Sequence, residues 1–299
     1  MHVLVQSIVD GLVFGAVYAI AGVTFGLVYE TTKVFHIAFG SIGTLGTYVA
    51  VWIAGAGSGV GALVGTTLVG MLVGGAATIV VVSLVYQPLV RRGAGPGATF
   101  VASLGLSFVI EAVVVLVFGP NNRSFAVNAF VRQHDVAGYG ISWYDGVVVA
   151  IAIVLIGCIS LLLNRTRAGH QVRAVASNRE QAQLVGIRTG IVTLVVCGLA
   201  SAVAIISFVL LAMHSSVVAT GGTQLTLFAI LAVIAGGVGS IAGTASVGVA
   251  IGALNGITAS LLPGDSAGAW STTIVFALVL VLILARPSGL VRRAAGVKT

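Results

Sequence analysis

The sequence predicts an all-α integral membrane protein, a polytopic bundle of about eight to ten transmembrane helices. Only 7% of the 299 residues are charged, and 58% are hydrophobic. Soluble domains carry roughly 25% charged residues. The apolar runs are long and continuous, near the 20 or so residues that a helix needs to cross the hydrocarbon, whereas a membrane β-barrel shows short alternating segments. We therefore expect a single transmembrane domain over residues 1–299.

The apolar runs give the order of the spans. Six spans are predicted before residue 220, at residues 5–29, 36–54, 60–86, 98–118, 146–163 and 191–213. The region 225–262 is too long for one simple helix, and glycines are dense between residues 236 and 243. We expect two shorter helices there, forming a hairpin around a glycine-rich turn. The last span covers residues 269–285.

Basic residues predict the orientation of these spans. They cluster at residues 91–92, in the segment 164–190 and in the tail 286–299, and the positive-inside rule places all three in the cytoplasm. The loop 119–144, taken with Asp145 directly after it, holds two arginines and two aspartates, so its charge is balanced and it is expected outside. These positions explain the net charge of +7, so nucleic-acid binding is not predicted. No cationic region precedes the first apolar run, so no cleaved signal peptide is expected.

Glycine spacing predicts close helix packing. Gly248, Gly252 and Gly256 stand four residues apart, so they share one helix face and form a smooth groove for a second helix. That helix can belong to this chain or to a dimer partner. Another set, Gly40, Gly43 and Gly46, comes every three residues and could permit an unwound stretch where the backbone faces a polar substrate.

The segment 164–190 is basic and helix-forming, and it lies between two apolar runs. Ser177 and Glu180 have the spacing of a capping box, which predicts a short amphipathic helix after residue 178. Such a helix suits a groove on a partner protein. The alternative is a solvated loop or one that lies on lipid headgroups. The residues expected to couple this segment to a partner are Arg173, Arg179, Glu180, Ala182 and Gly186.

Catalytic chemistry is not predicted in this chain. A P-loop needs a lysine after glycine, and the two lysines, Lys33 and Lys298, follow other residues. The five histidines are scattered without the H-E-x-x-H spacing of a zinc protease, so no metal site is expected either. If transport is driven by ATP, the nucleotide belongs to another chain.

Few polar residues lie within the predicted spans. Glu111 is the one acid well inside a span, and a charge there is costly unless it faces a cavity or a partner. We take Glu111, His36, Gly40, Asn255 and Thr258 as candidates for a substrate pathway. A structural hydrogen bond is the alternative role for Glu111, and a structural role is favoured for His36. Asn255 and Thr258 share a helix face and could bond across helices.

Several motifs together resemble the branched-chain amino acid ABC-transporter permeases of the LivH type. The Glu180 to Gly186 spacing resembles the EAA-x-x-x-G loop that ABC-importer permeases use to hold their ATPases. The other matching segments are F-H-I-A-F-G at 35–40, L-G-L-S at 104–107, the stretch 166–187, G-G-V-G-S-I-A-G at 236–243 and R-P-S-G-L at 286–290.

The resemblance implies a bacterial inner-membrane importer with several subunits. It implies a second permease subunit, normally a related chain in a heterodimer, two ABC ATPases that bind ATP and Mg²⁺, and an extracytoplasmic binding protein. His36 and Glu111 stand where the family usually has other residues. Permeases for urea, short amides or other amino acids are the alternatives within this class. An autonomous channel or secondary carrier and a non-transporting scaffold are the alternatives outside it.

Overall fold

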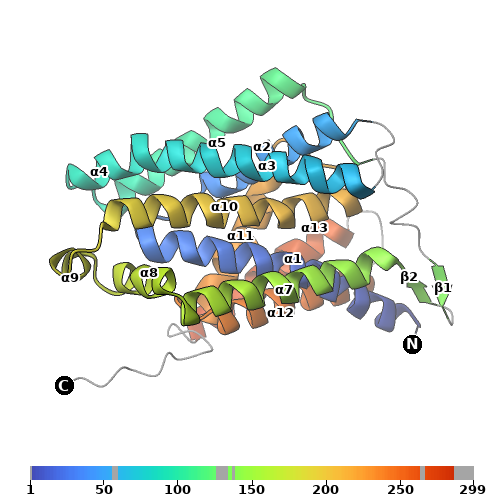
Figure 1. The fold of residues 1–299 in the computed structure, drawn as a ribbon. Coiled ribbons are helices and arrows are strands. Elements are labelled where there is room, and N and C mark those ends of the chain that lie inside the picture. Colours follow the sequence, from blue (N-terminus) through green and yellow to red (C-terminus); the bar gives the residue numbers. More distant parts are fainter. Residues whose placement is uncertain (1, 56–59, 126–133, 137–138, 263–266, 286–299) are drawn as a thin grey trace. The chain divides into compact units, whose positions relative to one another are not determined.

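The structure is a computed structural model that describes residues 2–55, 60–125, 134–136, 139–262 and 267–285. Helices account for most of these residues (Figure 1). In chain order the elements are α1 (His2–Thr32), α2 (Ala38–Ala54), α3 (Val60–Val81), a π-helix η1 (Val82–Tyr86), α4 (Gln87–Arg91), α5 (Pro96–Phe118), β1 (His134–Val136), β2 (Tyr139–Ile141), α7 (Trp143–Arg165), α8 (Arg167–Ser177), α9 (Arg179–Leu184), α10 (Thr189–His214), α11 (Gly221–Gly236), α12 (Ile241–Leu261) and α13 (Ala267–Ala285).

The described helices confirm the predicted all-α polytopic membrane fold. Six of them are long and apolar enough to cross a membrane: α1, the continuous α3–η1–α4 rod, α5, α7, α10 and α12. Three shorter apolar helices, within α2, α11 and α13, add to these. Two short strands, β1 and β2, pair antiparallel in the loop that the sequence placed outside the membrane. The basic tail and its R-P-S-G-L motif lie outside the described residues.

The chain divides into two compact units. One unit comprises residues 1–26, 128–156 and 227–299, and the other comprises residues 27–127 and 157–226. We call them the first and the second unit. Three of the four boundaries fall inside α1, α7 and α11, so each of these helices contributes to both units.

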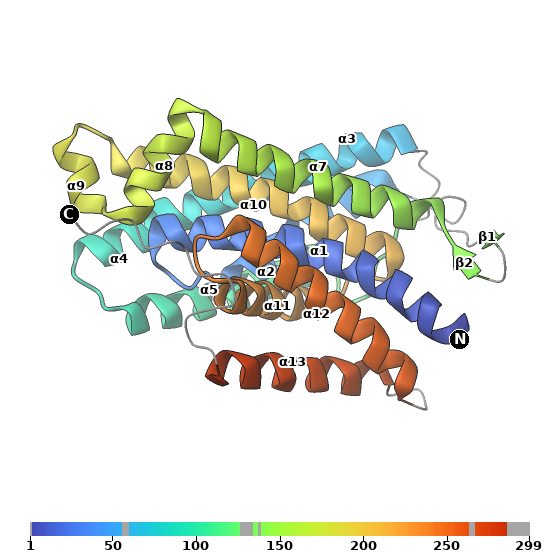
Figure 2. The ribbon, with the colours of Figure 1, turned by 90° about the horizontal axis from the view of Figure 1, so that it is seen from below.

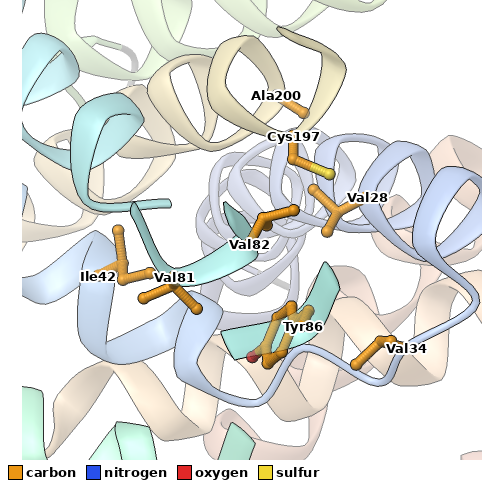
Figure 3. Packing of buried hydrophobic residues seen from close by; sticks show 8 residues of the cluster. All are labelled: Val28, Val34, Ile42, Val81, Val82, Tyr86, Cys197 and Ala200. Carbon is orange, nitrogen blue, oxygen red and sulfur yellow. The ribbon is translucent and has the colours of Figure 1, made fainter. Parts of the chain in front are cut away.

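The second unit packs around the π-helix. Figure 3 shows eight buried residues that come from the end of α1 and its following loop, α2, the α3–η1 junction and α10. The π turn has a local cause in Pro88, which has no N–H to donate to the carbonyl four residues earlier. The Gln87 N–H instead bonds to the Val82 carbonyl, five residues back, which is the π-helical pattern. Val82 and Tyr86 are both buried by this turn.

The expected unwinding of α2 is wrong, because α2 is continuous through Gly40, Gly43 and Gly46. These glycines instead allow other helices to approach. A Cβ at Gly43 would lie 2.5 Å from Cζ of Phe208, and one at Gly46 would lie 2.9 Å from the carbonyl oxygen of Gly70. Both distances are shorter than a carbon atom can tolerate. Glycine at these two positions therefore allows α10 and α3 to pack directly against α2.

The hairpin in the first unit is confirmed. Helix α11 ends at Gly236 and α12 begins at Ile241, and the turn between them uses Gly237 and Gly239 with φ values of 94° and 88°. Such positive φ angles favour glycine. The hydroxyl of Ser240 then caps α12 by accepting from the Gly243 N–H at 3.0 Å. Figure 2 shows α13 returning beside α12.

Candidate functional site

Helices α8 and α9 form the segment that the sequence analysis singled out for partner binding, and both belong to the second unit (Figure 1). Thr166 caps α8, because its hydroxyl accepts from the Gly169 N–H at 3.0 Å. Val172 and Val175 are buried on one side of α8. Arg173 is half-buried, and its Nη1 donates to Oδ1 of Asn164 at 3.0 Å. This helix is therefore fixed to the end of α7.

The predicted capping box is wrong by one residue. Ser177 is the last residue of α8, and the residue that caps α9 is Asn178. Oδ1 of Asn178 accepts from the N–H groups of Glu180 and Gln181 at 3.0 and 3.1 Å. Asn178 has extended backbone angles, so one residue ends α8, turns the chain and starts α9. Glu180 itself is exposed at the first turn of α9.

Helix α9 ends in a Schellman motif. The Gly186 N–H bonds to the Gln183 carbonyl at 2.9 Å, and the Ile187 N–H bonds to the Ala182 carbonyl at 3.0 Å. Gly186 has a φ of 82°, the left-handed conformation that this motif requires. A Cβ at Gly186 would meet no atom within 4 Å, so the conformation, and not close packing, explains this glycine.

The apolar residues of α9 face in two directions. Ala182 is buried, whereas Leu184 is 87% exposed and Val185 is 75% exposed. Both large side chains stand at the end of a helix that is capped at each terminus. Arg179 is half-buried at the start of the same helix. The structure thus brings Arg179, Glu180, Ala182 and Gly186 together on one short element, with Arg173 on the helix before it.

A polar seam runs along α5 in the second unit. Thr99, Ser103, Ser107 and Glu111 follow at four-residue spacing, and the three hydroxyl residues are buried. Oε1 of Glu111 accepts from the hydroxyl of Ser41 at 3.0 Å, of Ser107 at 3.3 Å and of Thr223 at 3.2 Å. These donors come from α2, α5 and α11, so one half-buried carboxylate joins three helices.

His36 lies in the loop before α2 and connects to the same seam. The hydroxyl of Tyr86 donates to Oγ of Ser103 at 2.8 Å, and Nδ1 of His36 lies 2.7 Å from that hydroxyl. Burial lowers the pKa of His36 to about 3, so the ring is neutral. The Tyr86 hydroxyl proton is already donated to Ser103, so this hydroxyl can only accept from His36. Nδ1 of His36 must therefore carry the ring proton and donate it to Tyr86. Nε2 is then an unprotonated acceptor, buried without a partner in the described part of the chain.

Gly40 lies beside this seam. A Cβ on Gly40 would collide with the carbonyl of Gly222 and the hydroxyl of Thr226. The contact places the start of α11 directly on α2, next to Ser41 and Thr223. Glu111, His36 and Gly40 therefore belong to one arrangement within the second unit.

Asn255 and Thr258 belong to the first unit. Nδ2 of Asn255 donates to the Tyr18 hydroxyl at 3.3 Å, and Oδ1 accepts from the Ser271 hydroxyl at 2.9 Å. Asn255 thus links α12 to α1 and α13, as expected of a bond across helices. The hydroxyl of Thr258 donates to carbonyls of its own helix, those of Leu254 and Asn255. The prediction of a bond across helices is therefore wrong for Thr258, because its hydroxyl proton is donated within α12.

The glycines of α12 face α1 within the first unit. A Cβ at Gly248 would lie 2.7 Å from Cα of Ala19. Gly252 lies against the backbone of Gly15, and Gly256 lies against the carbonyl of Ser7. The contact is thus made within the chain.

Sequence reasoning missed Ser41, Ser103, Tyr86 and Thr223. The signal for Ser103 was present, because Ser103 and Ser107 precede Glu111 at four-residue spacing and so share its helix face. Nothing local in the sequence points to Tyr86 or Thr223, which reach the seam only through the packing of η1 and α11.

Comparison with known proteins bears on what this arrangement serves. A family model described as "Branched-chain amino acid transport system / permease component" matches residues 7–284. The high-affinity branched-chain amino acid transport system permease protein BraD of Pseudomonas aeruginosa is 26% identical over 301 residues, which cover 96% of this chain and 95% of BraD. The corresponding permease protein LivH of Escherichia coli K12 is 24% identical with the same coverage.

A solved structure shares the fold. PsaBC from Streptococcus pneumoniae in complex with Fab superposes with a TM-score of 0.50 at 12% sequence identity, covering 96% of this chain and 93% of that chain. The family model spans nearly the whole sequence, and the relatives match over nearly their full length, which confirms the resemblance read from the motifs. This chain belongs to the permease component family of branched-chain amino acid transport systems.

Proposed function

We propose that this chain is the transmembrane permease subunit of an ATP-driven ABC importer for branched-chain amino acids. The family and the names of BraD and LivH support this substrate class. Permeases for urea, short amides or other amino acids remain the alternatives within the same class.

The proposed assembly places this chain in the bacterial cytoplasmic membrane beside a second, related permease. Two ABC ATPases bind ATP and Mg²⁺, and an extracytoplasmic binding protein delivers the solute, so this chain needs no cofactor of its own. The segment 164–190 and the carboxyl terminus face the cytoplasm in this proposal, as their basic residues favour.

The exposed end of α9 is the observation that carries the proposal. Leu184 and Val185 present large apolar side chains on a helix that is fixed by Asn178 at one end and by Gly186 at the other. A rigid helix with an exposed apolar end suits a groove in a partner, and each such side chain gains about 1.5–3 kcal/mol when fully buried. Docking on an ATPase would supply that burial and transmit its movement to α10.

The proposal is tested by Leu184→Asp in the reconstituted importer. A buried, unpaired carboxylate at the interface should lower binding-protein-stimulated ATP hydrolysis and leucine uptake at least about tenfold. Gln171→Asp on exposed α8 adds the same charge to the neighbouring helix and serves as the control. Membrane insertion should be normal in both variants. Unchanged uptake and hydrolysis in Leu184→Asp would exclude docking through this end of α9.

The polar seam is the proposed contribution to the pathway. A carboxylate held by three hydroxyls from α2, α5 and α11 would respond to any relative shift of these helices, because each helix holds one donor. Alternating access requires such shifts. Most of the solute-binding energy is assigned to the delivery protein, so a single polar seam is enough here.

The same seam favours one rival, an autonomous channel or secondary carrier that uses Glu111 as its ion site. The purified chain alone in liposomes distinguishes the two. Flux without ATP would support the carrier, and flux that requires the ATPases and the binding protein would support the importer.

A further inference from the structure

A cavity of about 420 Å³ lies within the second unit, at the ends of several helices. Its walls come from the end of α1, from η1 and α4, from α9 and from the first turn of α10. Three membrane-crossing segments end at this cavity, at Thr32, Arg91 and Thr189, and all three residues line it. The cavity therefore lies where the hydrocarbon gives way to the lipid headgroups.

The charge of this cavity is positive. Arg91, Arg179 and Arg188 line it, and no Asp or Glu is among the described residues of its walls. Thr189, Gly190 and Ile191 form the first turn of α10 and also line it. The amino end of α10 carries partial positive charge, whereas α1 and α4 bring their carboxyl ends, with partial negative charge, to the same cavity. The helix ends therefore offset one another in part, and the preference for an anion comes from the three guanidinium groups.

An unpartnered hydroxyl marks the inner wall. Thr193 lies one turn further along α10, is 2% exposed and lines the cavity. Its Oγ1 is buried and has no hydrogen-bond partner among the residues that the structure describes. A buried polar group without a partner costs free energy, so this hydroxyl is suited to a ligand oxygen.

Apolar side chains form part of the remaining wall. Val34, Val82, Val90 and Ile191 line the cavity beside the arginines and the two amides of Gln87 and Gln183. An inorganic phosphate would leave this apolar wall uncovered, and the cavity is larger than such an ion fills. The lining instead suits an anion that carries an apolar group.

We propose that this cavity binds an anionic phospholipid, with the phosphate on Arg91 and Arg188 and the glycerol and first acyl carbons against the valines. Basic pockets between helix ends at the membrane surface are suited to such headgroups. The cavity shares α9 with the proposed docking site through Arg179 and Gln183, and it shares Tyr86 with the seam, but Leu184, Val185 and Glu111 do not line it. Variants of Arg91 and Arg188 therefore test lipid binding without changing the exposed end of α9 or the Glu111 carboxylate.

The test uses the assembled importer in nanodiscs of phosphatidylcholine, with and without phosphatidylglycerol. The double variant Arg91→Gln/Arg188→Gln removes two cavity charges and leaves Arg179 in place. Arg92→Gln is the matched control, because Arg92 is the next residue, is exposed and does not line the cavity. The measurements are phosphatidylglycerol retained by the complex in native mass spectrometry and the midpoint of thermal unfolding.

The wild type and Arg92→Gln should retain phosphatidylglycerol and unfold at a higher temperature when it is present. The double variant should bind it more weakly by roughly fivefold for each arginine removed. Thr193→Val should also lose lipid affinity while unfolding normally in phosphatidylcholine, because the native hydroxyl has no protein partner to lose.

Three results would overturn the proposal. Equal retention of phosphatidylglycerol by the double variant and the control would show that the cavity is not the site. Stabilisation by inorganic phosphate in phosphatidylcholine discs, equal to that by the lipid, would assign the cavity to a free anion. An effect of the double variant that vanishes when the permeases are studied without ATPases would assign the arginines to a carboxylate of that partner.

Discussion

At the residue scale, Ser103 is the residue on which the seam depends. Its Oγ accepts from the Tyr86 hydroxyl at 2.8 Å and from the Ala38 N–H at 3.1 Å. Ala38 is the first residue of α2, and the side chain before it makes no cap, so a serine on α5 caps a different helix. One side chain thereby ties η1 and α2 to α5.

We expect Ser103→Ala to lower the free energy of unfolding by about 1–3 kcal/mol, because it leaves a buried hydroxyl and a helix-end N–H without their acceptor. Ser215→Ala is the control, since Ser215 is exposed, directly follows α10 and donates its hydroxyl to the Leu211 carbonyl in the last turn of that helix. Denaturant titration of the purified permease in detergent measures both. A loss in Ser103→Ala no larger than in the control would mean that water replaces the serine.

Glu111→Gln separates a transport role from a structural one. Glutamine keeps the size and one acceptor oxygen, so the hydrogen bonds from Ser41, Ser107 and Thr223 can persist while the charge is removed. If the charge serves the pathway, leucine uptake should fall about tenfold, the effect of a lost charged hydrogen bond, with little change in unfolding. Normal uptake together with reduced stability would assign Glu111 to structure alone.

The roles of some of these residues could be predicted from the sequence, whereas those of others could not, and the difference has physical reasons. Glu111 was predictable because an acid in an apolar span is rare, and Asn255 because amides in spans usually bond to other helices. Ser103 shares the helix face of Glu111, but its bonds to Tyr86 and Ala38 could not be predicted, and neither could the role of Thr223, because small hydroxyl residues in spans commonly bond their own helix, as Thr258 does. Only the packing of α5 and α11 against α2 decides which hydroxyls face a carboxylate.

At the element scale, α12 packs closely against α1 because the glycines on its facing side have no side chains. Gly248, Gly252 and Gly256 let the two backbones approach, and the four-residue spacing that predicted this groove is visible in the contacts. Helices of this kind gain little from the hydrophobic effect within lipid, so close packing contributes a large share of their association.

Gly252→Ala should therefore destabilise the chain by about 1–3 kcal/mol, because the new methyl group collides with the backbone of Gly15. Gly65→Ala in α3 is the matched control, since a Cβ there meets no atom within 4 Å. Alanine is the better helix former, so the control should be neutral or slightly stabilised. Thermal unfolding in detergent compares them, and equal midpoints would contradict the close approach of α1 and α12.

At the scale of the whole molecule, the single span α7 determines how the surface segments are distributed across the membrane. Trp143 at its start is 76% exposed and follows the strand β2, whereas its end leads into α8 and α9. Because α7 crosses the membrane once, these two ends lie on opposite sides, and the arginines after residue 164 favour the cytoplasm for the second end. The proposed docking of α9 requires the same assignment.

We expect Leu184→Cys, in a background of Cys158→Ser, to react with a membrane-impermeant maleimide in inside-out vesicles and not in right-side-out vesicles. Cys197 is buried and can remain. Trp143→Cys in the same background should show the opposite pattern, because it lies at the other end of α7. Adding the ATPases should slow labelling at residue 184 and leave residue 143 unchanged, since docking would cover only the end of α9. Labelling of residue 184 from the outside would overturn the proposed orientation, and unchanged labelling with the ATPases bound would place their contact elsewhere on the chain.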